Sequence, residues 1–284
     1  MVRIALFISL VRILYADPAY VVLVDKKTNH IQLASYGEAG YKIVKTFHAT
    51  LGQALGDKEQ ENDLKTPEGI YFFTTELRPP KLQPKFGSLG FAMNFPNTFD
   101  RHAGKTGSGI MLHATNEPER LKRNYDSQGC VVVKNEEIEE IKSYVRLGLT
   151  PIMIFSELQL PAIHPDESLR QFFEQWRQSW ESKDMETYSA AYHDAFLSQT
   201  KDKNAWIAYK KQLTKRYSTI SVQAEHVRFY VHPKYSVVSF TQNYVSYVAH
   251  GQFGRRSRGT KFLTVLKVNG KWRILDESFS ERTS

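Results

Sequence analysis

The stretch Ser127-Gln128-Gly129-Cys130-Val131-Val132-Val133 (SQGCVVV) contains the only cysteine of the 284-residue chain. A single thiol forms no disulfide within the chain and is too little for a cysteine-based metal site. Cys130 is therefore either a small buried residue or a reactive nucleophile. Gly129 lets the backbone approach closely, and His113 ends an apolar run upstream. Because a nearby imidazole can generate the reactive thiolate, these neighbours favour a nucleophile.

Length and composition indicate an ordinary globular protein with room for two domains. The chain is 41% hydrophobic and 24% charged, which argues against disordered and fibrous classes. Most of its net charge of +8 comes from the residues after Pro165. This basicity suits nucleic acid, an anionic membrane or an anionic polymer such as cell wall. Since no RRM, zinc finger or Arg/Gly-rich tract accompanies it, we expect no nucleic-acid partner.

The N-terminal segment, residues 1–18, leaves two interpretations open. A charged start at Met1-Val2-Arg3 precedes an apolar stretch over 4–11, and Ala16 could end a cleavage site, as in a signal peptide. Arg12 interrupts the apolar stretch, which equally fits an amphipathic helix in a chain that starts further upstream. Either way the run is too short to cross a bilayer, so we expect no transmembrane segment.

The sequence up to residue 157 predicts a sheet-rich domain over 19–157. Residues 20–24 and 31–34 are apolar and flank the polar turn 25–29, which predicts a strand pair. Further strands are expected at 41–49, 70–75, 109–113 and 150–155, with a helix at 136–145, a polar loop at 51–65 and an irregular segment at 79–90.

A two-proline stretch, 158–165, predicts a linker, and the pattern then changes to an α+β domain over 166–284. Apolar side chains recur at helical spacing over 166–183. The other expected helices are 185–192 and 205–217, and the expected strands are 221–231, 236–249, 260–268 and 272–279. Asn269-Gly270 predicts a hairpin turn, and the basic stretch 254–259 is expected to be a solvated loop.

Four separated motifs fall in the order and spacing of one family. They are Thr66-Pro67-Glu68-Gly69-Ile70-Tyr71, Asn94-Phe95-Pro96-Asn97 with Asp100, Gly109-Ile110-Met111-Leu112-His113, and Ser127-Gln128-Gly129-Cys130. Together they resemble the L,D-transpeptidase (YkuD-type) catalytic domain over roughly residues 19–155. The resemblance implies a mainly-β fold, a cysteine nucleophile, and action on peptidoglycan stem peptides in the periplasm or cell envelope.

The resemblance also implies roles for individual residues. The nucleophile falls on Cys130 and the general base on His113, oriented by the backbone carbonyl of Ala114. Backbone N–H groups around Gly129 and Cys130 would stabilise an oxyanion. The residues expected to contact substrate are Ser127, Gln128 and Asn94. We expect no metal and no cofactor, and we interpret Asp25 and Asp100 as turn residues, although Asp100 could also shape the site.

Three features depart from the transpeptidases of this family. Val132 stands where many of them carry arginine, Gln128 replaces a frequent histidine, and the charged segment 114–123 suits a solvated lid. These features favour hydrolysis, and the whole chain resembles the cell-shape-determining L,D-carboxypeptidases of ε-proteobacteria. The predicted reaction removes the terminal D-alanine from stem tetrapeptides through a thioester. The alternatives are cross-linking of stem peptides and an amidase reaction that releases wall-linked protein.

The second domain resembles the NTF2-like fold, in which helices and a curved sheet enclose a conical pocket. The aromatic residues expected to line or close the cone are Trp176, Trp180, Tyr188, Tyr192, Trp206 and Tyr209. Core packing is the favoured role for them. The alternative is a sugar or peptide pocket with Arg255, Arg256 and Arg258 near its rim, in a wall-binding protein whose catalytic domain is idle. The fold often dimerises through its sheet, so a homodimer is conceivable.

Overall fold

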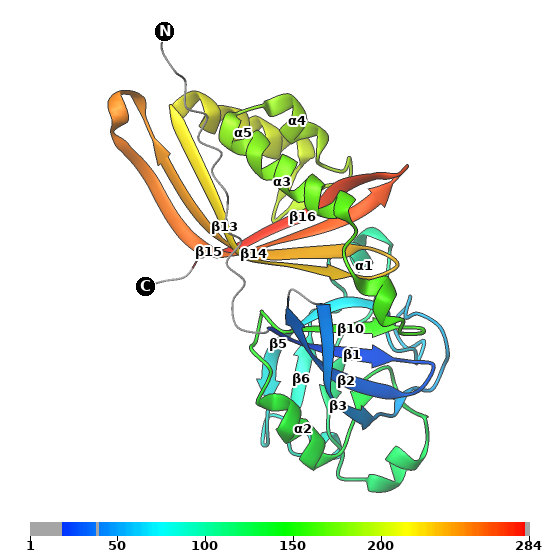
Figure 1. Cartoon of the computed structure of the whole chain (residues 1–284). Coiled ribbons are helices and arrows are strands. Elements are labelled where there is room, and N and C mark those ends of the chain that lie inside the picture. Colours follow the sequence, from blue (N-terminus) through cyan, green and yellow to red (C-terminus); the bar gives the residue numbers. More distant parts are fainter. Residues whose placement is uncertain (1–18, 38–39, 282–284) are drawn as a thin grey trace.

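The computed structural model describes residues 19–37 and 40–281, which form two units that pack against each other (Figure 1). The N-terminal segment expected to be a signal peptide or an amphipathic helix lies outside the described residues. The first unit contains β1 (Ala19–Asp25), β2 (His30–Gly37), β3 (Gly40–His48), β4 (Leu51–Gly52), β5 (Gly69–Leu77), β6 (Gly90–Met93), α1 (Thr98–His102), β7 (Met111–His113), β8 (Tyr125–Ser127), β9 (Val131–Val132), α2 (Asn135–Lys142) and β10 (Pro151–Phe155).

An eight-stranded mixed sheet organises the first unit, with strand order β3-β2-β1-β10-β5-β6-β7-β9. The residues of β1 from Val21 to Val24 are fully buried. Such a continuous apolar run is typical of a central strand that is covered on both faces. On one face, Ile138 and Ile141 of α2 join the main core of the unit.

The predicted turn after β1 is present, and its sequence explains it. Asp25 accepts hydrogen bonds from the Lys27 N–H (3.0 Å) and from the Thr28 hydroxyl (2.9 Å), and Asn29 adopts a left-handed φ of 57°. A carboxylate that bonds the backbone two residues on stabilises a tight turn. The turn-residue role expected for Asp25 is therefore what the structure shows.

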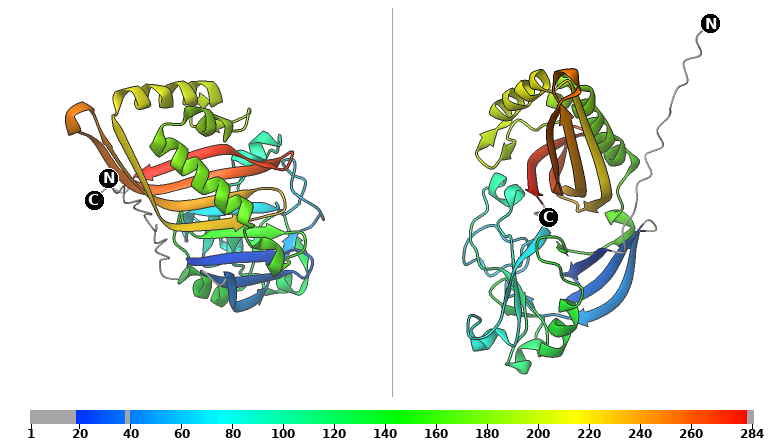
Figure 2. Two further views of the ribbon diagram at one scale, coloured as in Figure 1. Left: turned by 45° about the horizontal axis from the view of Figure 1, so that its top comes forward. Right: turned by 90° about the vertical axis from the view of Figure 1, so that its left-hand side faces the viewer.

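The second unit has the expected order of helices followed by a meander. It contains α3 (Glu167–Ser182), α4 (Met185–Ala190), β11 (Leu197–Ser198), β12 (Lys201–Asp202), α5 (Lys203–Arg216), β13 (Thr219–Val231), β14 (Ser236–Tyr247), β15 (Phe253–Val268) and β16 (Lys271–Glu281). The four long strands form an antiparallel sheet in the order β13-β14-β15-β16 that bends around the helices (Figure 2). Leu169, Phe173 and Trp176 of α3 pack against Phe240 and Leu263 of this sheet.

The solvated loop expected at 254–259 is wrong, because these residues belong to β15. Arg255 pairs with Ser246 of β14, and Arg258 pairs with Asn243. The arginines are exposed, whereas the intervening Ser257 is buried. The basic residues between two glycines resemble a loop in the sequence, but here they belong to a strand that pairs with residues 243–246 of β14 across a hairpin.

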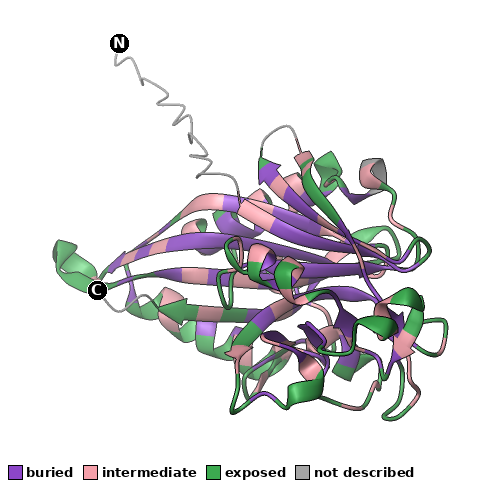
Figure 3. Ribbon diagram, turned by 90° about the horizontal axis from the view of Figure 1, so that it is seen from below, coloured by how far each residue is buried: buried purple, intermediate pink, exposed green. Residues whose placement is uncertain are grey.

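A third apolar cluster joins the two units. Val21 and Leu23 of β1 pack with Tyr230, Val237 and other residues of the second unit. Buried residues therefore run along the strands of both sheets, whereas the connecting loops are exposed (Figure 3). Among the residues described, no helix is long and apolar enough to cross a membrane.

Candidate active site

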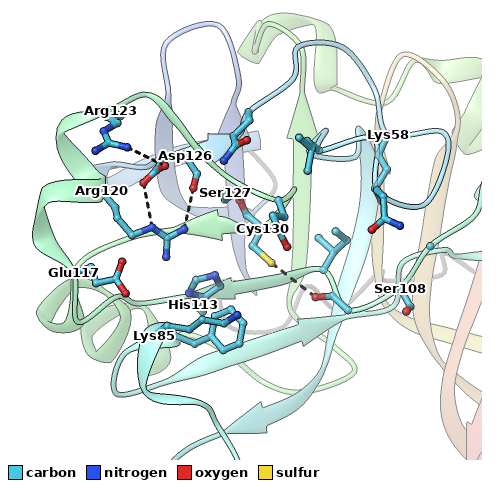
Figure 4. A pocket seen from close by; sticks show the side chains of 18 of the residues that line it. Lys58, Lys85, Ser108, His113, Glu117, Arg120, Arg123, Asp126, Ser127 and Cys130 are labelled. Atoms are coloured by element: carbon cyan, nitrogen blue, oxygen red, sulfur yellow. Dashed lines mark hydrogen bonds and ion pairs between the residues drawn. The ribbon is translucent and has the colours of Figure 1, made fainter.

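The pairing of β7 with β9 positions both predicted catalytic residues. These strands are parallel, with Leu112 opposite Val131 and His113 opposite Val132. Because side chains alternate along a strand, Leu112 and Val131 enter the core while His113 and the residue just before Val131 face the other side. That preceding residue is Cys130. The ladder therefore places thiol and imidazole on the same face, and both line one pocket (Figure 4).

His113 is held in one tautomer. Its Nδ1 lies 2.5 Å from the Ala114 carbonyl oxygen. A carbonyl only accepts hydrogen bonds, so Nδ1 carries the proton and Nε2 of the neutral ring is free to accept one. The side chain is 1% exposed, and this burial lowers its pKa to about 4, against the opposing effect of the Ala114 hydrogen bond. The backbone carbonyl of Ala114 is thus placed to orient the imidazole of His113, the role predicted for it.

Cys130 is half-buried at the surface of the pocket. Its Sγ is 3.8 Å from the Gly109 carbonyl oxygen. Burial raises the pKa of the thiol, and a hydrogen bond from the Met111 backbone N–H opposes the rise only in part. Within the described residues no hydrogen bond joins Cys130 to His113. The resting pair is therefore a neutral thiol and a neutral imidazole, and catalytic hydrogen bonds of this kind often form only when substrate binds.

The turn before Cys130 is fixed by its own hydrogen bonds. The Ser127 hydroxyl donates to the Cys130 carbonyl oxygen (2.6 Å) and accepts from the Gly129 N–H (3.1 Å). Gly129 has a φ of +115°, and a Cβ there would lie 2.7 Å from the Lys65 carbonyl oxygen. Of the two predicted oxyanion donors, the Gly129 N–H is already used, and only the Cys130 N–H is uncommitted in the described hydrogen-bond network.

The pocket around Cys130 has a volume of about 850 Å³ and a highly charged lining. Four cations border it together with four carboxylates: Lys58, Lys85, Arg120, Arg123, Glu61, Glu117, Glu119 and Asp126. Arg120 is partly neutralised by Asp126, with its Nε 3.2 Å from a carboxylate oxygen. The charged lid segment indicated Arg120 and Arg123 in general terms, but the sequence offered no signal for Lys85. The lining therefore offers cations to the anionic groups of a substrate and carboxylates to its amino groups.

The structure brings together most of the predicted site residues. Ser127 and Gln128 line the pocket with the catalytic pair. Asn94 is absent from the described lining. Its side-chain Oδ1 accepts a hydrogen bond from the Phe72 N–H (2.8 Å) and links the end of β6 to β5. This geometry gives Asn94 a structural role, and substrate contact by Asn94 stays a prediction. The motif resemblance alone could not distinguish a structural role of Asn94 from substrate contact, because both roles need a polar side chain in the same loop.

Asp100 is structural as well. It is fully buried, forms a capping box with Asn97 at the start of α1, and lies 3.0 Å from the Lys105 ammonium. It is a helix-capping residue and does not line the catalytic pocket, whose described residues include none from α1.

The second unit has a smaller cavity of about 190 Å³. Trp180, Trp206 and Tyr209 line it, whereas the other predicted aromatics, Trp176, Tyr188 and Tyr192, are core residues. Of the three arginines expected at its rim, Arg255 is the one that borders it in the described lining.

Lys210 is the unusual residue of this cavity. Its ammonium lies 4.4 Å from the centre of the Trp180 ring and 4.6 Å from that of Trp206. Burial lowers its pKa to about 7, although the charge of Glu277 favours the protonated form. Glu277 itself is paired with Lys261. No carboxylate of the described residues is in direct contact with Lys210, so an anionic group bound in the cavity would stabilise its protonated form.

Comparisons with known proteins agree with this geometry. Residues 19–154 match the L,D-transpeptidase catalytic domain (YkuD), and residues 168–278 match the Cds6 C-terminal NTF2-like domain. Bd1075 of Bdellovibrio bacteriovorus has a similar structure, with a TM-score of 0.78, 30% identity, and coverage of 95% of this chain and 97% of that chain. Pgp2 of Campylobacter jejuni, a helical cell shape determining protein, has a TM-score of 0.72 at 23% identity, with 93% of each chain covered, and is similar in fold.

YafK of Escherichia coli strain K12, named as an L,D-transpeptidase, is 27% identical over 134 residues, 46% of this chain and 49% of that protein. The chain spans about half the length of the curated relatives it matches.

Proposed function

Because the chain belongs to the L,D-transpeptidase family and carries an NTF2-like C-terminal domain, we propose that it is a cysteine-type peptidoglycan L,D-carboxypeptidase of the cell envelope. It removes the terminal D-alanine from stem tetrapeptides. The observation that carries the proposal is the β7–β9 ladder, which presents Cys130 and His113, held in one tautomer, in the same pocket.

The geometry supports a two-step acyl transfer. Cys130 Sγ attacks the carbonyl carbon of the bond to D-alanine while His113 Nε2 takes the thiol proton. The C–N bond breaks as His113 returns that proton to the leaving amine, which leaves a thioester on Cys130. Water, activated by His113, then attacks the thioester and releases the shortened peptide. The Cys130 N–H stabilises the oxyanion in each step.

The proposal favours water over an acceptor amine. Val132, which stands in place of the family's frequent arginine, is fully buried, and its N–H and carbonyl both bond to Thr50. This position therefore offers no cation for holding an acceptor peptide. The basic groups Lys85, Arg120 and Arg123 instead border the pocket where the carboxylates of one stem peptide would lie.

The test is incubation of the purified protein with muropeptides followed by mass spectrometry. We expect conversion of tetrapeptides to tripeptides plus free D-alanine, lost by at least a factor of 10³ in Cys130→Ala and in His113→Ala, in keeping with effects of removing a nucleophile or base. Cross-linked dimers would establish transpeptidation, and release of a diaminopimelate-linked protein would establish the amidase. Full activity in Cys130→Ala would contradict all three reactions.

A second candidate function is wall binding through the cavity of the second unit, favoured by the buried cation Lys210. The full-length Cys130→Ala protein should then bind muropeptides, and adding Lys210→Met should weaken that binding about tenfold or more, as for a lost charge-assisted contact. Lys211→Met, an exposed neighbour on α5, is the matched control. Equal binding by all three proteins would exclude the cavity as a ligand site.

A further inference from the structure

The turn between β13 and β14 reaches from the second unit into the first. At its tip, the Lys234 ammonium lies 2.6 Å from a carboxylate oxygen of Asp57 and 3.0 Å from one of Glu68. The adjacent Tyr235 hydroxyl bonds both the N–H (2.7 Å) and the carbonyl (2.8 Å) of Ile70. These contacts join positions that are more than 160 residues apart in the chain, so they depend wholly on the docking of the two units.

Asp57 and Glu68 are the two acidic residues that share this lysine. Asp57 also accepts from Lys105 (2.6 Å) and from the Glu68 N–H (2.7 Å). Burial opposes ionisation of Asp57, but the hydrogen bonds from Lys105 and Lys234 outweigh it and lower its pKa. Glu68 is paired in addition with Lys26 at 3.0 Å. Without Lys234, each carboxylate therefore keeps one cation.

Asp57 belongs to the segment 53–65, which forms a wall of the active-site pocket. Lys58, Glu61 and other residues of this segment line the pocket. The Gln53 N–H donates to the Ser127 carbonyl (2.9 Å), and the Lys65 carbonyl packs against Gly129. The segment thus contacts the turn that carries Cys130 at both of its ends.

No described residue of the second unit lines the catalytic pocket itself. Any influence of that unit on the pocket must therefore pass through intermediate groups. The apolar cluster between the units contacts the central strands, whereas the Lys234–Asp57 ion pair is the charged contact that ends on the pocket wall.

We propose that Lys234 is a positioning residue: through Asp57 it clamps the pocket-lining segment 53–65 against the Cys130 turn, so that the second unit sets the shape of the substrate site. Only the expected effect of the clamp on kinetics rests on the proposed function. Its structural consequence, a loosened segment 53–65, can be measured without substrate.

The test compares full-length wild type, Lys234→Met and Lys234→Arg by hydrogen–deuterium exchange mass spectrometry. We expect exchange of peptides covering 53–65 to speed up about tenfold in Lys234→Met, as for loss of one charged hydrogen bond, and to return toward wild type in Lys234→Arg. Exchange in β14 and β15 should stay the same. Lys27→Met, which removes an exposed ion pair with Glu157, is the matched control.

Kinetics on the tetrapeptide provide the second readout. A clamp on the substrate wall predicts a KM raised several-fold in Lys234→Met with kcat changed less, because Cys130 and His113 are untouched. Asp57→Asn should give the same pattern. The clamp is overturned if the exchange of residues 53–65 is unchanged in both Lys234→Met and Asp57→Asn. It is also overturned if exchange becomes faster throughout the chain. Absence of tetrapeptide hydrolysis by wild type contradicts the proposed function alone, because the exchange result stands without it.

Discussion

His113 and Cys130 show how burial acts on two residues in opposite directions. Burial disfavours charge, so it lowers the pKa of the imidazole to about 4 and raises that of the thiol above its usual 9.0. Near neutral pH both groups are uncharged. The pair therefore differs from a preformed thiolate–imidazolium, and the proposed reaction requires the thiol proton to move to His113 as the attack on substrate begins.

This state predicts the pH dependence of thiol reactivity. Only the thiolate reacts with iodoacetamide, so the alkylation rate of Cys130 should be low at pH 7 and rise about tenfold per pH unit up to the raised thiol pKa. In His113→Ala the profile should keep the same shape. A rate that is flat between pH 5 and 8 in wild type would contradict the neutral pair. Intact-mass spectrometry measures the rate, since Cys130 is the only thiol in the chain.

The lowered pKa of Lys210 predicts how the free energy of unfolding depends on pH. The unfolded chain binds a proton up to about pH 10.5, whereas the folded chain releases it near pH 7, so stability rises with pH between these values, by up to about 1.4 kcal/mol per pH unit. Urea unfolding should show Lys210→Met to be more stable than wild type at pH 7. The advantage should shrink by pH 9. If the stability difference between Lys210→Met and wild type did not depend on pH, the lowered pKa of Lys210 would be contradicted.

Among the elements, the connection from β8 to β9 contains a glycine that a larger residue cannot replace without strain. Gly129 combines a φ of +115° with a site where a Cβ would lie 2.7 Å from the Lys65 carbonyl oxygen. A side chain there must move either the Cys130 turn or the segment 53–65.

Gly129→Ala should therefore cost about 10²-fold or more in kcat/KM, as expected for a small misplacement of a catalytic group. Circular dichroism should show the fold retained, because the nearest contacts of the added Cβ are with the neighbouring segment 53–65 and Ile110. Gly104→Ala is the control, since its φ of +75° is also positive but nothing lies within 4 Å of the added Cβ. Equal activity of the two variants would show that the close contact between residue 129 and the Lys65 carbonyl oxygen does not limit activity.

At the scale of the whole molecule, the shared apolar cluster couples the two units. Leu275 of the second unit is fully buried in the cluster that also contains Val21 and Leu23 of the first. Units that share a core this way are expected to unfold together, because separating them exposes the apolar surface of both.

Leu275→Ala should lower the unfolding free energy by about 2–5 kcal/mol. The loss should appear equally in two probes. Tryptophan fluorescence reports the second unit, where all four tryptophans lie, and reactivity of Cys130 reports the first. The two urea curves should stay superimposed in wild type and in the variant. Separate curves, with the Cys130 transition unmoved, would show independent units.

The sequence by itself determined most of the long strands and helices and singled out His113 and Cys130 as the candidate catalytic pair. Strands such as β1 and helix α3 follow from local apolar patterns, and the turn at Asn269-Gly270 follows from residues that favour positive φ. His113 and Cys130 were identifiable because the chemistry needs those residue types in short motifs.

Only the tertiary structure decided the surroundings of that pair. It made 53–65 a pocket wall, turned the supposed loop at 254–259 into strand β15, gave Asn94 a structural role, and brought Lys234 to Asp57 across 177 positions of sequence. The physical reason is that local patterns report backbone preference and burial. Which charged groups meet depends on how the two sheets dock, and no segment carries that information alone.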